Sequence, residues 1–354
     1  MNRLLMIAVA LVALVAGAWI LKDRVALYLF LQNIERQISW DLRDDLDDGL
    51  HVAFCGTGSP LPDLGRGGAC TAVIAGKQVF LFDAGEGSAE SLALMGILPS
   101  SVEAVFLTHF HSDHINGLGA LVLQHVFRGG TSEPLTVYGG PGVERVVDGF
   151  NEAFALDHEY RVAHHGEAAA PASGLELRAK RLVIGDSGTT QALRANGVSI
   201  TAFEVSHEPV VPAYGYRVEY NGRSAVISGD TAYSANLTKA AKGADLLVHE
   251  ALAPKLVSSL QQTAERHGRD GLAIVMRDIP SYHASPDDAV RTANEAGVGA
   301  LALTHLIPGL PGVWFNDLFT DGAEDAFSGP FWVMNDGDVI SMPGGGGIHR
   351  SHAR

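Results

Sequence analysis

Residues Thr108-His-Phe-His-Ser-Asp-His114 place three histidines and one carboxylate within a single short run of the chain. Imidazole and carboxylate groups are the usual protein ligands of zinc and similar divalent metals. The apolar residues 104–107 before this run predict a short buried strand, and residues 115–126 after it predict a helix. The run is therefore expected at the carboxyl end of a strand, where α/β folds commonly place their sites.

The spacing within this run divides its side chains between two neighbouring sites. His109 and His111 are two positions apart, so they can point in the same direction, toward one metal. Asp113 and His114 open the following turn and can reach a second metal close by. A helix cap needs one carboxylate and no histidine, so capping alone does not explain the run.

Three further side chains of metal-ligand type each follow an apolar run later in the chain. His207 follows the predicted strand 200–205, and Asp230 and His305 come directly after two more apolar segments. Together with the first run they supply enough ligands for two metals, with Asp230 as the bridge. His249 also follows a strand, and its role stays open. We interpret the other histidines as surface or core residues; they are His51, His125, His158, His164, His165, His267, His349 and His352.

The composition is that of a globular protein with ample material for a core. The chain has 354 residues, of which 47% are hydrophobic and 18% charged, which fits one large or two small domains. The chain has 25 Lys and Arg residues and 40 Asp and Glu residues, which gives a net charge of −15. Because an acidic surface repels polyanions, nucleic acid is not the expected partner. A small anionic ester could still be attracted to a cationic metal centre.

The amino-terminal residues 4–21 carry no charge and are flanked by Arg3 on one side and by Lys22 and Arg24 on the other. A bilayer core is crossed by about 20 apolar residues. We therefore predict a membrane anchor over residues 1–24, with a cleaved signal peptide or a buried core helix as alternatives. The domain would then lie on the periplasmic side of a bacterial inner membrane, or be exported after cleavage.

The rest of the chain divides into a connector, one globular domain and a tail. The mixed, acidic residues 25–48 predict an amphipathic connector, residues 49–343 the domain, and residues 344–354 a flexible tail. Strand and helix patterns alternate in two halves, which predicts sheets sandwiched between helices. Asn221-Gly222 predicts a tight hairpin turn, whereas residues 140–198 have the least regular pattern.

The chain has two cysteines, Cys55 and Cys70, which are expected to end two neighbouring strands. Two cysteines are too few for a zinc ribbon. A disulfide and a pair of buried thiols are both compatible with the sequence.

The motifs, taken in order, resemble the metallo-β-lactamase superfamily, and within it ribonuclease Z and the zinc-dependent arylsulfatases. Any one of these glycine-containing motifs is weak evidence, whereas the ordered set, which extends from residue 51 to about 340, is specific. The matching segments are Gly56-Thr-Gly-Ser-Pro60, Leu81-Phe-Asp-Ala-Gly-Glu-Gly87, Thr108 to His114, the His207 to Tyr216 run, Ser228-Gly-Asp-Thr231, Val248-His-Glu-Ala251 and Leu303-Thr-His305.

This resemblance implies a four-layer αββα sandwich that holds two zinc ions, with Mn²⁺ or Fe²⁺ as alternatives. It implies His109, His111 and His207 on the first metal, and Asp113, His114 and His305 on the second, with Asp230 between them. Asp113 would also orient the attacking water. The segment around His283 resembles the part of ribonuclease Z that carries a proton donor, with Glu250 to align it; the simpler alternative is that His283 only precedes a helix cap.

One departure from ribonuclease Z affects the expected substrate. That family carries a long arm for tRNA, whereas here a short hairpin joins Tyr216 to Asp230. We therefore expect a membrane-anchored dizinc hydrolase that cleaves a phosphodiester or sulfate ester by attack of zinc-bound hydroxide. The alternatives are a ribonuclease Z-type endonuclease for tRNA 3′ ends, an acyl hydrolase of the lactonase or β-lactamase type, and a binding module without activity. The oligomeric state, a homodimer included, stays open.

Overall fold

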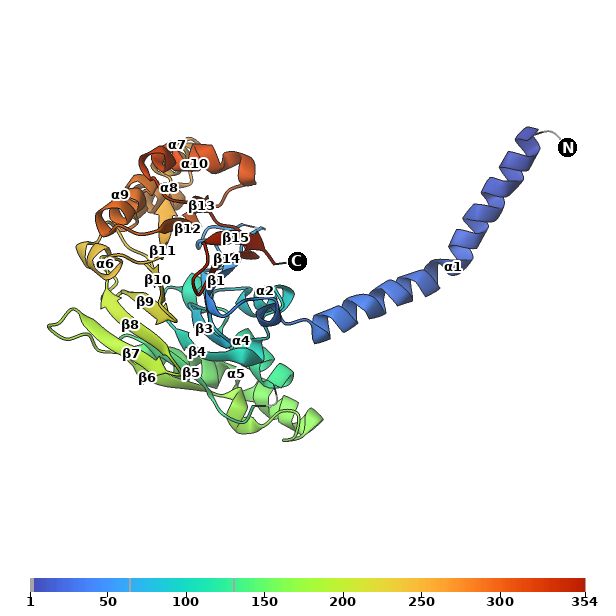
Figure 1. Ribbon diagram of the computed structural model, residues 1–354, viewed down its shortest axis with the longest axis horizontal. Helices are drawn as coiled ribbons and strands as arrows, with labels where there is room; N and C mark the ends of the chain where they lie inside the picture. The colour runs from blue at the N-terminus through green and yellow to red at the C-terminus, as the bar shows by residue number, and fades with distance from the viewer. Residues whose placement is uncertain (1–2, 64, 130, 354) are drawn as a thin grey trace. The chain divides into compact units, whose positions relative to one another are not determined.

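The computed structural model describes residues 3–63, 65–129 and 131–353. The chain divides into two compact units, Met1–Asp41 and Leu42–Arg354. The first unit consists of one long helix, α1, which spans Arg3–Ser39 (Figure 1).

Helix α1 covers the segment that was predicted to be a membrane anchor. It continues past the charged residues 22–24 as far as Ser39, so it runs through the predicted boundary between anchor and connector. Within the part of the chain that the structure describes, no helix combines the length and the apolar character needed to cross a membrane. The predicted membrane anchor was therefore wrong, and so was the predicted location at an inner membrane, which depended on it. Residues 1–2 of the predicted anchor lie outside the described residues.

The second unit is built on two mixed β-sheets that pack face to face, with helices on their outer sides (Figure 1). This is the predicted αββα sandwich. The strands of the first sheet are, in spatial order, β15 His349–His352, β14 Asp338–Pro343, β1 Gly49–Gly56, β2 Cys70–Ala75, β3 Gln78–Phe82, β4 Val102–Phe106, β5 Leu135–Gly139 and β6 Leu177–Arg181. Those of the second are β13 Phe331–Val333, β12 Ala300–Ile307, β11 Leu246–Leu252, β10 Arg223–Ile227, β9 Tyr214–Tyr220, β8 Val198–Glu204 and β7 Thr189–Ala195.

The outer layers are formed by helices on each side of this pair of sheets. Helix α2 contacts β1 and α5 contacts β5 and β6, while α6 contacts β8 and α9 contacts β11 and β12. The helices are α2 Ser88–Leu94, α3 Ser112–Ile115, α4 Leu118–Gly129, α5 Val143–His165, α6 Ala235–Ala240, α7 Pro254–Arg266, α8 Asp270–Asp278, α9 Pro286–Ala296 and α10 Asn316–Thr320. Short 3₁₀ turns are η1 Leu42–Asp44, η2 Pro99–Ser101, η3 Ala172–Leu175, η4 Ile279–Ser281, η5 Val313–Phe315 and η6 Ala323–Ala326.

The central strands are buried on both faces. In β12, alternate residues belong to two different cores. Ala300 and Ala302 belong to the core between the two sheets, whereas Leu301 and Leu303 belong to the core under the outer helices. Successive side chains of a strand point to opposite faces, so a continuous apolar run predicts burial on both sides. These runs place the polar residues that follow them at the ends of buried, rigid strands.

Several local predictions are confirmed. Asn221 and Gly222 have φ values of 47° and 73°, as the predicted turn between β9 and β10 requires. Helix α9 begins with a capping box at Ser285, so the segment that contains His283 does precede a helix cap.

Other parts of the chain differ from expectation. The single helix expected after the first motif is two helices, α3 and α4, separated near Gly117. The poorly patterned residues 140–198 contain α5, β6 and β7. Residues His349–His352 of the predicted flexible tail form β15, which pairs antiparallel with β14; Arg354 lies outside the described residues. Strand pairing supplies the order that this polar, glycine-rich sequence does not indicate by itself.

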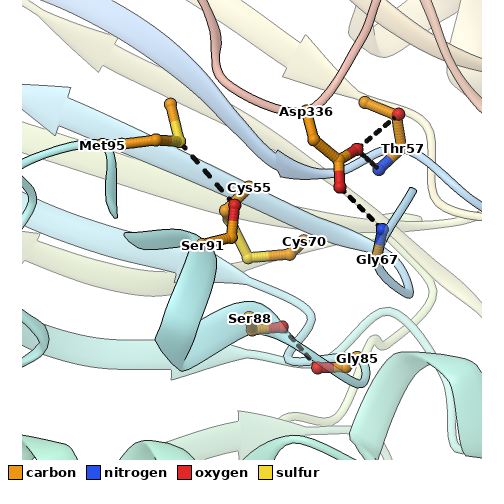
Figure 2. The surroundings of a disulfide bond; sticks show 9 residues. All are labelled: Cys55, Thr57, Gly67, Cys70, Gly85, Ser88, Ser91, Met95 and Asp336. Atoms are coloured by element: carbon orange, nitrogen blue, oxygen red, sulfur yellow. Dashed lines mark hydrogen bonds between the residues drawn. A yellow bond between two sulfur atoms is a disulfide. The ribbon is translucent and has the colours of Figure 1, made fainter. Parts of the chain in front are cut away.

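Cys55 and Cys70 form a disulfide between the end of β1 and the start of β2, with their Cα atoms 5.0 Å apart (Figure 2). Both are buried. The loop between them is held a second time by the carboxylate of Asp336, which accepts hydrogen bonds from the backbone of Thr57 at 2.8 Å and of Gly67 at 2.6 Å (Figure 2). The loop is therefore held covalently at its ends and by hydrogen bonds to the turn between β13 and β14.

Replacing both cysteines by alanine should lower the free energy of unfolding by about 3 kcal/mol, because the disulfide closes a loop with a sequence separation of 15 residues. Urea unfolding of wild type and of the Cys55→Ala/Cys70→Ala variant measures the difference. A reducing agent should destabilise wild type by a similar amount and leave the variant unchanged. Equal sensitivity of both proteins to the reducing agent would contradict this assignment.

Candidate metal centre

The loop that follows β4 carries the first group of candidate ligands. His109 and His114 are almost completely buried, Asp113 is 8% exposed and His111 is exposed. The side chains converge as the spacing predicted: Nε2 of His109 lies 2.9 Å from Nδ1 of His111. Helix α3 begins directly after His111, so Asp113 and His114 project from its first turn.

The second sheet supplies the remaining ligands from the ends of three strands. His207 follows β8, Asp230 follows β10, and His305 lies within β12. The register between β11 and β12 shifts at this point, and His305 has a φ of 46°. A bulge of this kind redirects a side chain, here from the strand face toward the site. The prediction that His305 comes after the end of its strand is therefore corrected, although its side chain does reach the site.

All the predicted ligands meet in adjoining groups, in each of which one ligand atom per residue lies within 4.8 Å of the others. Asp230 belongs to two of them, and its Oδ2 lies 3.8 Å from Nε2 of His109 and 3.5 Å from Nε2 of His305. The groups are His109, His111, His207 and Asp230; Asp113, His114 and His305; and Asp230, His283 and His305.

The chemistry of these groups fits a divalent metal. Nε2 of His207, Nε2 of His114 and Nδ1 of His305 are buried and have no hydrogen-bond partner in the described residues. Burial lowers the pKa of His207, and burial together with neighbouring imidazoles lowers the pKa of His109 and His111. Neutral imidazoles with a free lone pair are what a metal requires.

Nearby carboxylates raise the pKa of two other ligand histidines, His114 and His305. In His114, burial opposes the charged form, but Asp230 and Asp83 together hold the pKa well above its ordinary value. A metal binds the neutral imidazole, so metal binding here would release a proton.

Asp83 supports this site, although the sequence analysis did not include it among the site residues. It follows β3, has a φ of 60°, and its Oδ2 lies 2.8 Å from Nδ1 of His114. The same carboxylate accepts hydrogen bonds from the backbone and hydroxyl of Thr108, both at 2.8 Å. Carboxylates in this position orient a metal-binding histidine. The pattern that predicted the other site residues, a polar residue directly after an apolar strand, also applies to Asp83 and could have identified it.

His283 belongs to the third of the ligand groups and is also paired with a carboxylate. Its Nδ1 is 2.8 Å from Oε1 of Glu250, a buried residue of β11 that also accepts a hydrogen bond from the backbone of Thr231. Burial opposes the charged form of His283, but Glu250 and then Asp230 raise its pKa to about 9. Because Nδ1 is engaged, Nε2 is the nitrogen available to a substrate.

The other histidines stay outside the ligand groups formed by residues 3–63, 65–129 and 131–353. His249 is fully buried with its Nδ1 2.7 Å from the carbonyl oxygen of Glu250. His125 is buried with its Nδ1 3.0 Å from the carbonyl oxygen of Pro99. These contacts are those of structural residues.

Residues 78–306 match the family model described as beta-lactamase superfamily domain. The chain belongs to the metallo-β-lactamase superfamily. Within this superfamily, whose members are metal-dependent hydrolases, the chain is similar to proteins named ribonuclease Z. It is 35% identical over 289 residues to the one from Mycobacterium bovis (strain BCG / Pasteur 1173P2), covering 81% of this chain and 96% of the relative. It is 36% identical over 263 residues to the one from Mycobacterium marinum, covering 74% and 88%.

A solved structure shows the same fold. The short form of human tRNase Z superposes with a TM-score of 0.59 at 22% identity, covering 83% of this chain and 99% of that chain. The predicted superfamily and its ribonuclease Z-like branch are confirmed.

These relatives correct the predicted function and partners. The main prediction, a membrane-anchored hydrolase of a phosphodiester or sulfate ester, was wrong, since the ribonuclease Z alternative fits the relatives better and no membrane-crossing helix is found among the described residues. The prediction that nucleic acid is an unlikely partner was also wrong, because the similar proteins are named for a nuclease. The prediction about nucleic acid relied on the net charge, which sums the whole surface. At physiological salt, exposed charges more than about 8 Å apart are largely screened from each other.

Asp83→Asn should weaken the binding of a divalent metal by about 10- to 100-fold, because His114 loses the carboxylate that orients it. Titration of the metal-free protein with zinc against a competing chelator measures the affinity. Asp245→Asn is the matched control, since Asp245 also accepts a backbone hydrogen bond, from Ser224 at 2.8 Å, but its side chain is paired with Arg223 rather than with a ligand histidine. Equal metal affinities for the two variants would contradict the role given to Asp83.

Proposed function

We propose that this chain is a ribonuclease Z-type endonuclease that removes 3′ extensions from precursor tRNA. The observation that carries the proposal is the His283–Glu250 pair beside the ligand clusters, in a chain that covers 96% of a relative named ribonuclease Z. A buried pair of this kind supplies a proton to an alkoxide leaving group, which hydrolysis of an RNA phosphodiester needs.

Two metal ions fit the ligand groups. His109, His111 and His207 would hold the first, and Asp113, His114 and His305 the second, with Asp230 between them. When bound, the metals would supply an activated water and neutralise charge that builds up on the phosphate. Zinc suits imidazole and carboxylate ligands, and manganese or iron(II) are alternatives.

The residues of the chain would then act on the substrate in defined ways. Asp113 orients the attacking water toward phosphorus. As the new P–O bond forms, the bond from phosphorus to the leaving nucleotide's oxygen breaks, and Nε2 of His283 gives that oxygen a proton. Glu250, 1% exposed and hydrogen-bonded to Nδ1, holds the ring in this orientation and favours its protonated form.

Purified protein should bind about two divalent metal ions per chain. Elemental analysis after dialysis against metal-free buffer measures the content. Asp230→Asn should lower it, because this carboxylate adjoins ligand atoms of both groups. Finding no bound transition metal in wild type, and none after incubation with zinc or manganese, would refute the assignment of the ligands.

His283→Ala should lower kcat for RNA cleavage by about 100- to 10,000-fold, the usual range for a general acid, while the metal content stays unchanged. Single-turnover cleavage at saturating enzyme measures the chemical step. His164→Ala, which removes an exposed histidine outside the ligand groups, is the control and should have no effect. A similar rate for both variants would show that His283 is not the proton donor.

The function itself is tested with a precursor tRNA that carries a 3′ extension. Metal-loaded wild type should release the extension in one endonucleolytic cut, and Asp113→Ala should not. Bis(p-nitrophenyl) phosphate serves as a substrate that needs only the metal pocket. If the protein hydrolyses this small diester but leaves the precursor tRNA uncut, the proposed substrate is overturned and the phosphodiesterase chemistry remains.

A further inference from the structure

Tyr282 lies at the edge of the metal centre, in contact with two of its histidines. Its ring centroid is 5.0 Å from that of His283 and 5.3 Å from that of His207. Tyr282 is partly exposed, whereas His207 is buried. The ring therefore borders both the proposed proton donor and a proposed metal ligand, and part of it remains accessible from outside.

The position of Tyr282 is fixed by its surroundings. Its carbonyl oxygen lies 2.9 Å from Nδ1 of His207, which places the residue relative to the ligand group. Together with Leu61 its side chain packs against an apolar cluster. The members of that cluster are Leu252, Val257, Met276, Ile279 and Ile307. An aromatic ring held in this way loses little conformational freedom when a ligand binds to it.

Hydrolysis by the metals, Asp113 and His283 does not itself require an aromatic side chain. A partly exposed aromatic ring beside the reacting phosphate offers what an unpaired nucleobase needs, a surface on which to stack. In the proposed reaction, His283 gives a proton to the oxygen that leaves phosphorus. Because Tyr282 contacts His283, the base nearest to Tyr282 belongs to the nucleotide that carries this oxygen, here called the leaving nucleotide.

We infer that Tyr282 stacks on the base of the leaving nucleotide and so positions the scissile phosphate. This inference rests on the proposed function and adds a contact by which the enzyme recognises the nucleotide at the cut. Tyr282 is then a positioning residue that acts mainly on KM, because stacking is the same before and during the reaction.

The test combines variants of Tyr282 with a change in the substrate. Wild type, Tyr282→Ala and Tyr282→Phe are compared on a precursor tRNA with a 3′ extension and on the same RNA with an abasic leaving nucleotide. On the normal RNA, Tyr282→Ala should raise KM about tenfold with little change in kcat, as loss of one base stack implies. Tyr282→Phe keeps the ring and should behave as wild type.

The abasic RNA separates stacking from a structural role. Wild type and Tyr282→Ala should cleave it with the same KM, because the base is already missing. If Tyr282→Ala raises KM equally on both RNAs, or if this variant has a lower metal content, Tyr282 has a structural role and the inference is overturned. If metal-loaded wild type hydrolyses bis(p-nitrophenyl) phosphate but cleaves neither RNA, the proposed function fails and the inference fails with it.

Discussion

The buried carboxylate of Asp230, surrounded by imidazoles from both sheets, is the interaction on which the site depends. Asp230 is 3% exposed, and its Oδ2 lies 3.3 Å from Nε2 of His114 and 3.5 Å from Nε2 of His305. A charge buried without partners costs several kcal/mol, so this carboxylate is stable only where those partners are assembled. His114 comes from the first sheet's side and His305 from the second. The two sheets must therefore pack with the carboxyl ends of β4, β10 and β12 at one edge.

Close backbone contacts set the position of the first ligand loop. A Cβ atom on Gly85 would lie 2.2 Å from the carbonyl oxygen of Asp113, and one on Gly117 would lie 2.2 Å from that of Gly85. The turn after β3 thus packs directly on the turn that carries Asp113 and His114. The disulfide and Asp336 hold the neighbouring loop, where a Cβ on Gly68 would lie 2.8 Å from the same oxygen of Asp113. Backbone packing therefore fixes the position of the loop that carries Asp113 and His114.

The overall charge of the chain and the chemistry of its site are separate properties. The net charge of −15 describes the whole surface, and it led the sequence analysis away from a polyanionic substrate. Within the site, burial keeps His109 and His207 neutral and ready for a cation, while Glu250 favours the protonated form of His283. With divalent metals bound, such a centre would attract a phosphate over a few ångströms, a range in which distant surface carboxylates have little influence.

The sequence by itself determined the type of fold and predicted which ligand-type residues come together, because residues that follow apolar runs meet where neighbouring strands end together. This rule anticipated the clustering of His109 and Asp230 with the rest of the predicted set. The short Asn221-Gly222 turn was readable from local chemistry. The tertiary structure alone decided the contacts that depend on distant partners: the bulge that turns His305 inward, the support of His114 by Asp83, the pairing of β15 and the order within residues 140–198. Such features arise from packing between segments far apart in the chain, and no local pattern of residue types records which segments will touch.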